Sequence, residues 1–269
     1  MSIERAQSQY RQVANFLREK ILNGDYPSGS TFPSEPELVK LIGEDRVSPV
    51  AVSPVSRTTI NRALLVLRAE GIIRVERGKR TIVRSVPTIR RDANTRYARD
   101  NREQHGARGA FDSEIIKLGF EPRSDLVQVG RTSPPADVAA ALKLEAGEDA
   151  LVRKRHMYAG ETPVQLATSY VPWSIAKATK LAKIDTGPGG MYSRLAELGH
   201  APVRFTETVS LRPPSTEEAD FLRLSDEQHV LVIFHKAWTS DTDTVEVTIH
   251  VLPPHQWELQ YGWPAEPPP

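Results

Sequence analysis

The 269-residue sequence contains no cysteine, which excludes disulfides, Cys-ligated zinc, iron–sulfur clusters and thiol catalysis. Its seven histidines are scattered without any His-x-x-x-His pair, so we expect no metal and no cofactor. No apolar run approaches the ~18 residues that cross a membrane. The N-terminal residues also lack the apolar core of a signal peptide. We therefore expect a cytoplasmic protein without a membrane partner.

The net charge is only +1, but the charged residues are unevenly distributed along the chain. Residues 1–100 hold 18 Lys and Arg against 11 Asp and Glu, a net of +7, and the other 169 hold 17 against 23, a net of −6. A basic segment joined to an acidic one indicates that the first meets a polyanion and the second has another task. A solvated basic face without a partner is the alternative, and the positions of the cations have to decide.

Three helices are predicted in the first 70 residues. Apolar residues at helical spacing predict the first helix up to Asn23, where Asn-Gly ends the pattern. The second helix begins after Ser34, which is placed as an N-cap, and runs to about Ile42. After a Ser-Pro-rich insertion, the third helix begins at the cap Ser56 and ends at Gly71.

A basic hairpin is predicted directly after these helices, in "IIRVERGKRTIVR". Three helices and a basic hairpin are the layout of a winged helix-turn-helix, in which the third helix enters the major groove of DNA and the wing reaches phosphates or the minor groove. Free N–H groups and hydroxyls at a helix start also bind phosphate. The candidate DNA-binding residues are Ser34, Glu35, Ser56, Arg57, Thr58, Thr59, Asn61, Arg62, Arg77, Gly78, Lys79 and Arg80.

Residues 8–84 resemble the DNA-binding domain of GntR-type bacterial transcription regulators. The resemblance rests on the Gly24-Asp25-Tyr26-Pro27-Ser28-Gly29 turn, then Pro33-Ser34-Glu35, then Val55-Ser56-Arg57-Thr58-Thr59. The sequence departs from the family pattern in three places: an insertion of about ten residues at 43–54, Pro36 after the Pro-Ser-Glu motif, and Arg80 in place of the second wing glycine. The operator of a relative therefore does not transfer to this protein.

The rest of the chain predicts a polar linker followed by a second domain. Residues 85–109 are rich in arginine and almost without aliphatic residues, so we expect an exposed linker that adds phosphate contacts or is a solvated hinge. Residues 110–269 alternate between helix and strand patterns, which predicts an α+β domain with an antiparallel sheet. The predicted domains are thus 1–84, the linker 85–109, and 110–269.

Residues 108–262 resemble the UTRA effector domain of the HutC branch of this regulator family, which has a chorismate lyase-like fold. The best matches are Arg153-Lys154-Arg155, Ser169-Tyr170-Val171-Pro172 and Tyr192. The resemblance implies a pocket for a small molecule. Arg153 and Arg155 point to one face of a strand and could clamp an anion, although a solvent-facing, salt-bridged strand would show the same pattern. The candidate effector-binding residues are Asp112, Arg153, Arg155, Tyr192 and His250, with ordinary packing as the alternative for His250.

Three positions differ from relatives that respond to sugar phosphates: Asp112, Ala167 and Gly190. A carboxylate at a helix start competes with a phosphate, so we expect an effector other than an amino-sugar phosphate. The function that these patterns favour is a dimeric regulator, by default a repressor, that binds a pseudo-palindromic operator in double-stranded DNA and responds to a small-molecule effector. The alternatives are an effector-independent DNA-binding protein and an enzyme built on the lyase-like fold, for which no nucleophile and base can be assembled.

Overall fold

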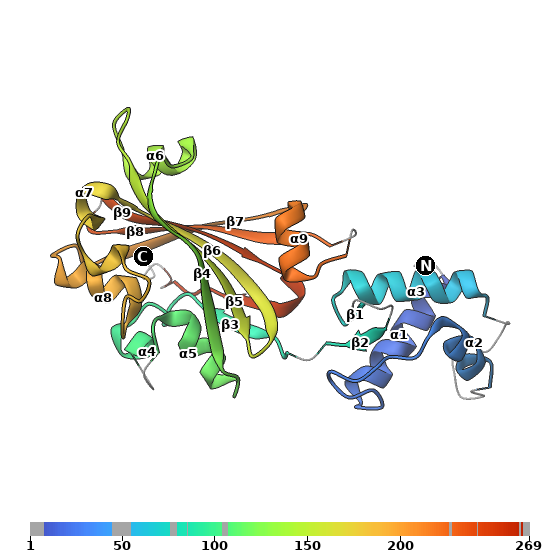
Figure 1. Ribbon diagram of the computed structural model, residues 1–269. Helices are drawn as coiled ribbons and strands as arrows, with labels where there is room; N and C mark the ends of the chain where they lie inside the picture. Colours follow the sequence, from blue (N-terminus) through green and yellow to red (C-terminus); the bar gives the residue numbers. More distant parts are fainter. Residues whose placement is uncertain are drawn as a thin grey trace. The chain divides into compact units, whose positions relative to one another are not determined.

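The computed structural model describes residues 8–44, 55–75, 80–84, 86–103, 107–225, 228–240, 242–263 and 265. The chain divides into two compact units (Figure 1), one formed by Met1–Pro87 and Leu224–Gln228 and the other by Thr88–Arg223 and His229–Pro269. Within the described residues, no helix is both long and apolar enough to cross a membrane.

The first unit contains three helices and a two-stranded sheet. Its elements are α1 (Gln9–Leu22), α2 (Glu35–Glu44), α3 (Arg57–Ala69), β1 (Ile73–Val75) and β2 (Thr81–Val83). The apolar faces of the helices meet in one core, to which Leu17, Leu38 and Leu67 contribute fully buried side chains. Because each helix alone is short, this shared core provides most of its stability.

A side-chain cap begins the third helix as the sequence predicts, whereas at the second helix the hydroxyl of Ser34 donates a hydrogen bond and does not accept one from the helix. The hydroxyl of Ser56 accepts a hydrogen bond from the backbone N–H of Thr59 at 3.1 Å. At α2, the carboxylate of Glu37 accepts from both the backbone N–H and the hydroxyl of Ser34, each at 2.7 Å. Strands β1 and β2 pair antiparallel, and this pair is the described part of the predicted wing. The predicted insertion lies outside the described residues from position 45 to position 54.

The second unit is built on a six-stranded antiparallel sheet of order β4-β5-β6-β9-β8-β7. Its strands are β4 (Pro122–Thr132), β5 (Ala150–Ala159), β6 (Thr162–Pro172), β7 (Arg204–Arg212), β8 (Val230–Trp238) and β9 (Thr244–Leu252). A separate parallel pair joins β3 (Ile89–Asp92) to β10 (Trp257–Gln260). The predicted α+β class with an antiparallel sheet is confirmed.

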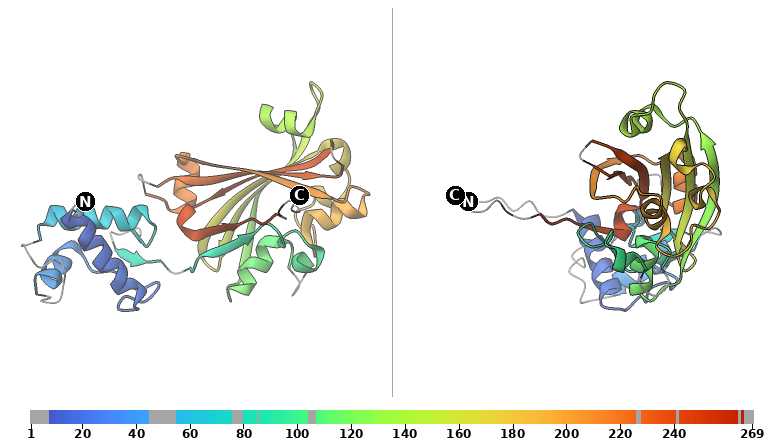
Figure 2. Two further views of the ribbon diagram at one scale, coloured as in Figure 1. Left: turned by 180° about the vertical axis from the view of Figure 1, so that it is seen from behind. Right: turned by 90° about the vertical axis from the view of Figure 1, so that its left-hand side faces the viewer.

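Helices cover both faces of this sheet (Figures 1 and 2). One face carries α4 (Arg99–Glu103), α5 (Ala110–Lys117) and α8 (Gly190–Glu197) together with the β3–β10 pair. The other face carries α6 (Ala136–Leu142) and α9 (Thr216–Leu222). The short α7 (Trp173–Ala176), η2 (Lys180–Ala182) and η3 (Pro254–Gln256) complete the unit.

The segment expected to be an exposed linker is structured instead. The boundary between the units falls between Pro87 and Thr88, and most of the predicted linker belongs to the second unit as β3 and α4. Arg91, Arg96 and Arg102 are 1%, 3% and 9% exposed, so these side chains are not available to phosphates. The prediction of an exposed linker was wrong because buried ion pairs and hydrogen bonds to carbonyls, and not aliphatic side chains, hold this segment.

Candidate functional site

The exposed side of α3 is the candidate DNA interface. Ile60, Ala63, Leu64 and Leu67 face the core of the first unit. This orientation leaves Arg57, Thr58, Asn61 and Arg62 exposed on the opposite side, with Thr59 half-buried. The start of α3 therefore presents two guanidinium groups, a hydroxyl and an amide to solvent, which are the groups that read base edges and phosphates.

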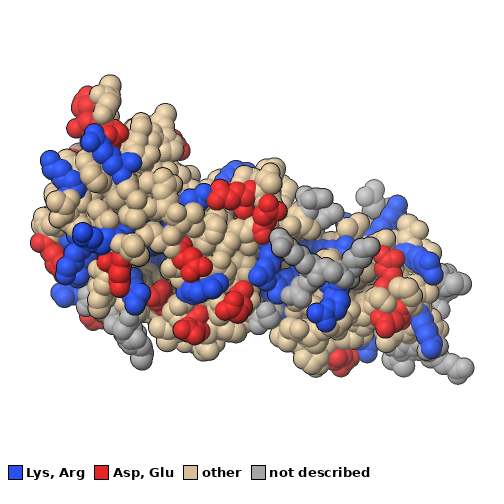
Figure 3. All heavy atoms as spheres, in the orientation of Figure 1, with Lys and Arg blue, Asp and Glu red and all other residues tan. Residues whose placement is uncertain are grey.

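The remaining DNA-binding candidates lie on α2 and at the wing. Ser34 and Arg80 are exposed and Glu35 is half-buried, whereas Arg77, Gly78 and Lys79 lie outside the described residues. On the face seen in Figure 3, Lys and Arg lie among Asp and Glu over both units and form no single continuous patch. The positions of the cations on α3 are thus more informative than the net charge of either half.

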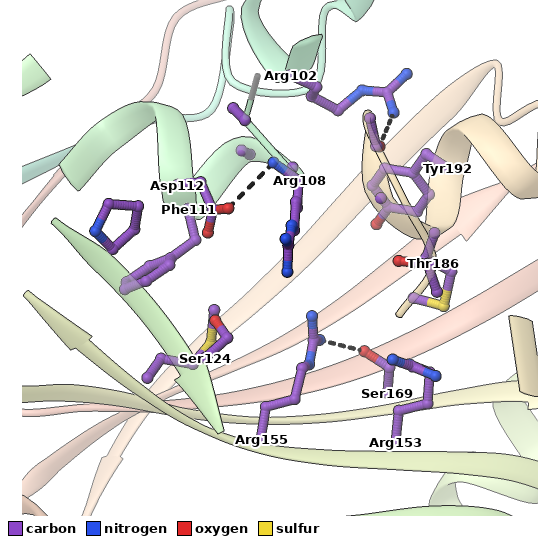
Figure 4. A pocket seen from close by; sticks show the side chains of 18 of the residues that line it. Arg102, Arg108, Phe111, Asp112, Ser124, Arg153, Arg155, Ser169, Thr186 and Tyr192 are labelled. Carbon is purple, nitrogen blue, oxygen red and sulfur yellow. Dashed lines mark hydrogen bonds between the residues drawn. The ribbon is translucent and has the colours of Figure 1, made fainter. Parts of the chain in front are cut away.

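The second unit contains a cavity of about 630 Å³ between the sheet and the helices α5 and α8 (Figure 4). All five predicted effector-binding residues line it: Asp112, Arg153, Arg155, Tyr192 and His250. The volume is in the range of pockets that bind small molecules. A solvent-facing strand, the alternative for the arginine pair, does not describe this geometry.

Arg153 uses its guanidinium group within the protein. It donates to the carbonyl oxygens of Leu181 at 2.9 Å and Ile184 at 3.0 Å, and also to that of Lys183. Burial and the neighbouring charge of Arg155 lower the pKa of Arg153 to about 10, so it remains a cation at neutral pH. Arg153 therefore holds the segment that leads into α8. Of the two arginines predicted to bind an anion together, only Arg155 has a guanidinium group available to a ligand.

Arg155, in contrast, makes few contacts within the protein. Its one hydrogen bond within the described protein goes to the hydroxyl of Ser169 at 2.9 Å, and its Nε has no partner. Burial lowers the pKa of Arg155, which is the cost of holding a cation away from water. Figure 4 shows Arg153 and Arg155 rising side by side from β5, while Arg108 points into the cavity from the opposite side.

Asp112 occupies the start of α5. Its carboxylate accepts from the backbone N–H of Arg108 at 3.1 Å. Burial raises the pKa of Asp112, although that hydrogen bond and the charges of Arg108 and Arg155 oppose the shift. A carboxylate thus lies at the start of α5, where it would repel a second anion.

Gly190, at the start of α8, lies in close contact with the backbone of Arg108. Its φ is +67°, and a Cβ at this position would clash with the carbonyl oxygen of Arg108. Only glycine fits both constraints, which gives a steric reason for its presence beside Tyr192.

A row of polar side chains begins at the floor of the cavity and continues along the same face of the sheet. Strand register places five of them directly opposite one another on β5, β6, β9, β8 and β7: Arg153, Ser169, Thr248, His235 and Glu207. Ser169 and Thr248 lie 2.5 Å apart, and Thr248 in turn donates to Glu246. Beyond this the hydrogen bonds run through Tyr192 and His235 to Glu207, which also pairs with Arg91.

The hydroxyl of Tyr192 lies between two side chains that can each carry a proton, His235 and Glu246. This hydroxyl lies 2.8 Å from Nε2 of His235 and 3.1 Å from Oε2 of Glu246. Since a hydroxyl has a single proton, it donates to one neighbour and must accept from the other. Either His235 is protonated at Nε2, or Glu246 is protonated; burial raises the pKa of Glu246, which favours the second arrangement.

His250 lies beside this row with its Nδ1 unpartnered, and it is 7% exposed. Burial, together with the charges of Arg91 and Arg96, lowers its pKa well below 6.5, so the ring is neutral. His250 thus lines the pocket, while packing also explains its burial.

Several lining residues were not predicted from the sequence. Glu246 shares the strand face of Thr248 and His250, and extending that period of two by one step would have found it. Arg96, Tyr97, Arg102 and Arg108 come from the segment interpreted as a linker, whose arginines were considered as phosphate contacts and not as part of a pocket.

Comparison with known proteins finds a family model that matches each unit. The model of the bacterial regulatory proteins of the gntR family matches residues 9–83, and the UTRA domain model matches residues 117–257. The uncharacterized HTH-type transcriptional regulator SCO4628 of Streptomyces coelicolor is 30% identical over 247 residues, which cover 90% of this chain and 87% of that protein. GgaR of Escherichia coli K12, also an HTH-type transcriptional regulator, is 25% identical over 240 residues, covering 89% and 85%. The crystal structure of PhnF from Mycobacterium smegmatis shares the fold, with a TM-score of 0.57 at 19% identity over 94% of this chain and 100% of that one.

The chain therefore belongs to the GntR family of bacterial regulatory proteins and carries a UTRA domain. It is a transcriptional regulator with a DNA-binding helix-turn-helix domain and an effector-binding domain. Both families are those of regulators, so the enzyme alternative is set aside and the expectation of a protein that is not an enzyme is confirmed.

Proposed function

We propose that this regulator binds a pseudo-palindromic operator as a homodimer and acts as a repressor. The observation that carries the proposal is the start of α3, where Ser56 caps the helix and Arg57, Thr58, Asn61 and Arg62 are exposed together. In a dimer, two such helices would enter successive major grooves about 34–36 Å apart. Twofold symmetry of the protein would then match an inverted repeat in the DNA.

A small-molecule effector bound in the cavity would regulate this binding. The predicted effector-binding residues meet in a cavity of suitable volume, and Arg155 lacks an ionic partner there. These features support a regulator that responds to a ligand over an effector-independent DNA-binding protein. To release DNA, the effector must prefer the non-binding state, with a coupling of typically ~1–3 kcal/mol.

The polar row would connect this effector to the strand that follows the DNA-binding unit in the chain. Hydrogen bonds lead from Arg155 at the cavity floor along the same face of the sheet to Glu207 and Arg91. Arg91 lies on β3, a strand that begins at Ile89, directly after the boundary between Pro87 and Thr88. A change of charge at Arg155 would therefore reach the first strand of the second unit through a continuous series of buried and partly buried contacts.

Binding of the full chain to the DNA upstream of its own gene tests this function. The salt dependence is measured on that DNA and on a scrambled duplex of equal composition. We expect protection of an inverted repeat, a large ratio of specific to nonspecific affinity, and a steep decrease of affinity with salt. Equal, weak binding to both duplexes would contradict the proposal.

A further inference from the structure

The arginines that line the cavity differ in what they already bind. Arg96 forms an ion pair with Glu114 at 3.0 Å, and both side chains are almost fully buried. Arg102 donates to the carbonyl oxygens of Tyr97 at 3.1 Å and Gly189 at 2.9 Å. Arg153 is held by three further carbonyls, as described above. These three guanidinium groups are structural.

Two arginines remain, and only one of them is partly buried. Arg108 has a side chain that is 67% exposed and lies 3.8 Å from Asp185, so water and a carboxylate already compensate its charge. Arg155 forms no ion pair within 4.0 Å among the described residues, its Nε is closed to water and unpartnered, and Glu246 and Asp112 act on its charge only from a longer distance. A partly buried cation without a carboxylate in contact is costly unless another group supplies the opposite charge.

The acids around the cavity limit how much negative charge a ligand can carry. Asp112, Glu121, Asp185 and Glu246 line it together with the five arginines. Asp112 also places a carboxylate at the start of α5, where it would repel a phosphate. A dianion would meet one available guanidinium and several carboxylates, whereas a monoanion would compensate Arg155 alone.

The surroundings of Arg155 further specify the ligand. Register places Ala167 directly opposite Arg155, so the neighbouring position on β6 carries no side chain beyond Cβ. A planar carboxylate matches the fork of a guanidinium group. Apolar walls are provided by Phe111, Ile116, Leu126 and Met157. Such walls fit the hydrocarbon part of a ligand.

We infer that the effector is a monocarboxylic acid with an apolar body, whose carboxylate binds Arg155 beside Ala167. This inference rests on the proposed effector role of the cavity and adds the chemical class of its ligand. Arg155 supplies the charge, Arg153 keeps the 181–184 segment in place, and Asp112 excludes a second anionic group from the start of α5.

Simple anions test the inference without knowledge of the natural effector. Thermal unfolding of the full chain is followed in sodium acetate, benzoate, phosphate and sulfate, with sodium chloride of equal ionic strength as the reference. Acetate and benzoate are expected to raise the melting temperature over chloride, benzoate more because of the apolar walls. Phosphate and sulfate stabilise folded proteins in general because they are excluded from the surface, so any increase that they give should not depend on Arg155.

Variants of β5 assign the effect to one side chain. Arg155→Gln should weaken benzoate binding by roughly 10- to 100-fold, the value of a charge-assisted hydrogen-bonded contact. Lys154→Gln is the matched control, since Lys154 is the next residue on the strand, faces the other side of the sheet and pairs with Glu217 at 2.6 Å. Its response to benzoate should equal that of the wild type.

Ala167→Glu provides a second test if Arg155→Gln does not fold. The new carboxylate would pair with Arg155 across the strands and abolish the response to benzoate while Arg155 remains. The inference is overturned if no carboxylate stabilises the wild type, if phosphate stabilises the wild type more than it stabilises the variants, or if either variant responds to benzoate like the wild type. DNA binding is measured on the same samples, so a failure of the regulator function itself would be seen separately.

Discussion

Arg91 and Glu207 form a buried ion pair that joins strand β3 to strand β7. Their side chains are 0% and 5% exposed, and Glu207 also accepts from Tyr97 at 3.1 Å and from Tyr261 at 2.8 Å. The adjacent Arg90 pairs with Glu258 at 3.0 Å, but there the two side chains are 64% and 52% exposed. Two neighbouring arginines thus make the same kind of contact in opposite surroundings.

This contrast predicts very different costs of removal. Arg91→Met should lower the free energy of unfolding by about 3–5 kcal/mol, because Glu207 would remain buried without its cation. Arg90→Met should cost less than about 1 kcal/mol, since water screens the exposed pair. Urea denaturation of the two variants measures both values. Equal costs would mean that β3 is not held to the sheet by the buried pair.

The two arginines also explain how far the sequence predicted the fold. The helices, the cap of α3 and the antiparallel sheet follow from apolar periodicity and from local turn residues, and these predictions are confirmed. The segment 85–109 has no apolar periodicity, so nothing local distinguishes a hinge from β3 and α4. Its order depends on acids that lie more than 100 positions away in the chain, such as Glu207 for Arg91.

The five candidate residues of the pocket were predictable from the sequence, but its other lining residues and the contacts of its charged groups were not. Alternation along β5 placed Arg153 and Arg155 on one face, and the structure brings both to the cavity. Whether each guanidinium is available depends on the carbonyls of residues 181–184 and on Ser169, which sequence spacing does not place. The role of each residue in binding remains a prediction.

The buried ring of His250 predicts a pH dependence of stability. Its pKa is far below 6.5 in the folded state, so below pH 6.5 the unfolded chain binds a proton that the folded chain does not. The stabilisation from a neutral His250 is therefore complete above pH 6.5 and is lost as the pH falls, by up to about 1.4 kcal/mol per pH unit. Burial raises the pKa of Glu246, which has the opposite effect at lower pH, so the wild-type slope alone is ambiguous.

A comparison of variants isolates the contribution of His250. Between pH 7 and 5, His250→Gln should lose less stability than the wild type when unfolding by urea is measured at each pH. His229 is exposed, and His229→Gln should keep the wild-type slope. Parallel curves for all three proteins would show that His250 titrates alike in the folded and unfolded chain.

The exposed start of α3 predicts a separation of specific from nonspecific DNA binding. Arg57→Ala should cost about 1–3 kcal/mol per half-site on the operator and relax the preference for its sequence. Arg80→Ala should weaken binding to all sequences alike and reduce the salt slope by about 1 per subunit. Both side chains are exposed, so the melting temperatures should not change. Full operator affinity in Arg57→Ala would show that α3 is not the recognition helix.

The polar row predicts that the pocket and the operator site are energetically coupled even without a ligand. Arg155→Gln removes the charge that a bound anion would neutralise, so it should weaken operator binding, by a factor in the range of roughly 5–150 that is usual for allosteric coupling. His235→Phe keeps the ring stacking on Tyr97, whose centroid lies 4.7 Å away, but removes the hydrogen bonds to Glu207 and Tyr192. In the His235→Phe background, Arg155→Gln should therefore have little further effect on operator affinity.

A double-mutant cycle of operator affinities measures this coupling, with Lys154→Gln as the control that should change neither background. The cycle distinguishes two routes. If the effect of Arg155→Gln disappears when His235 is replaced, the coupling passes through the row to Glu207 and Arg91. If the effect is the same in both backgrounds, the row only stabilises the sheet. The coupling would then have to leave the cavity through the 181–184 segment that Arg153 holds.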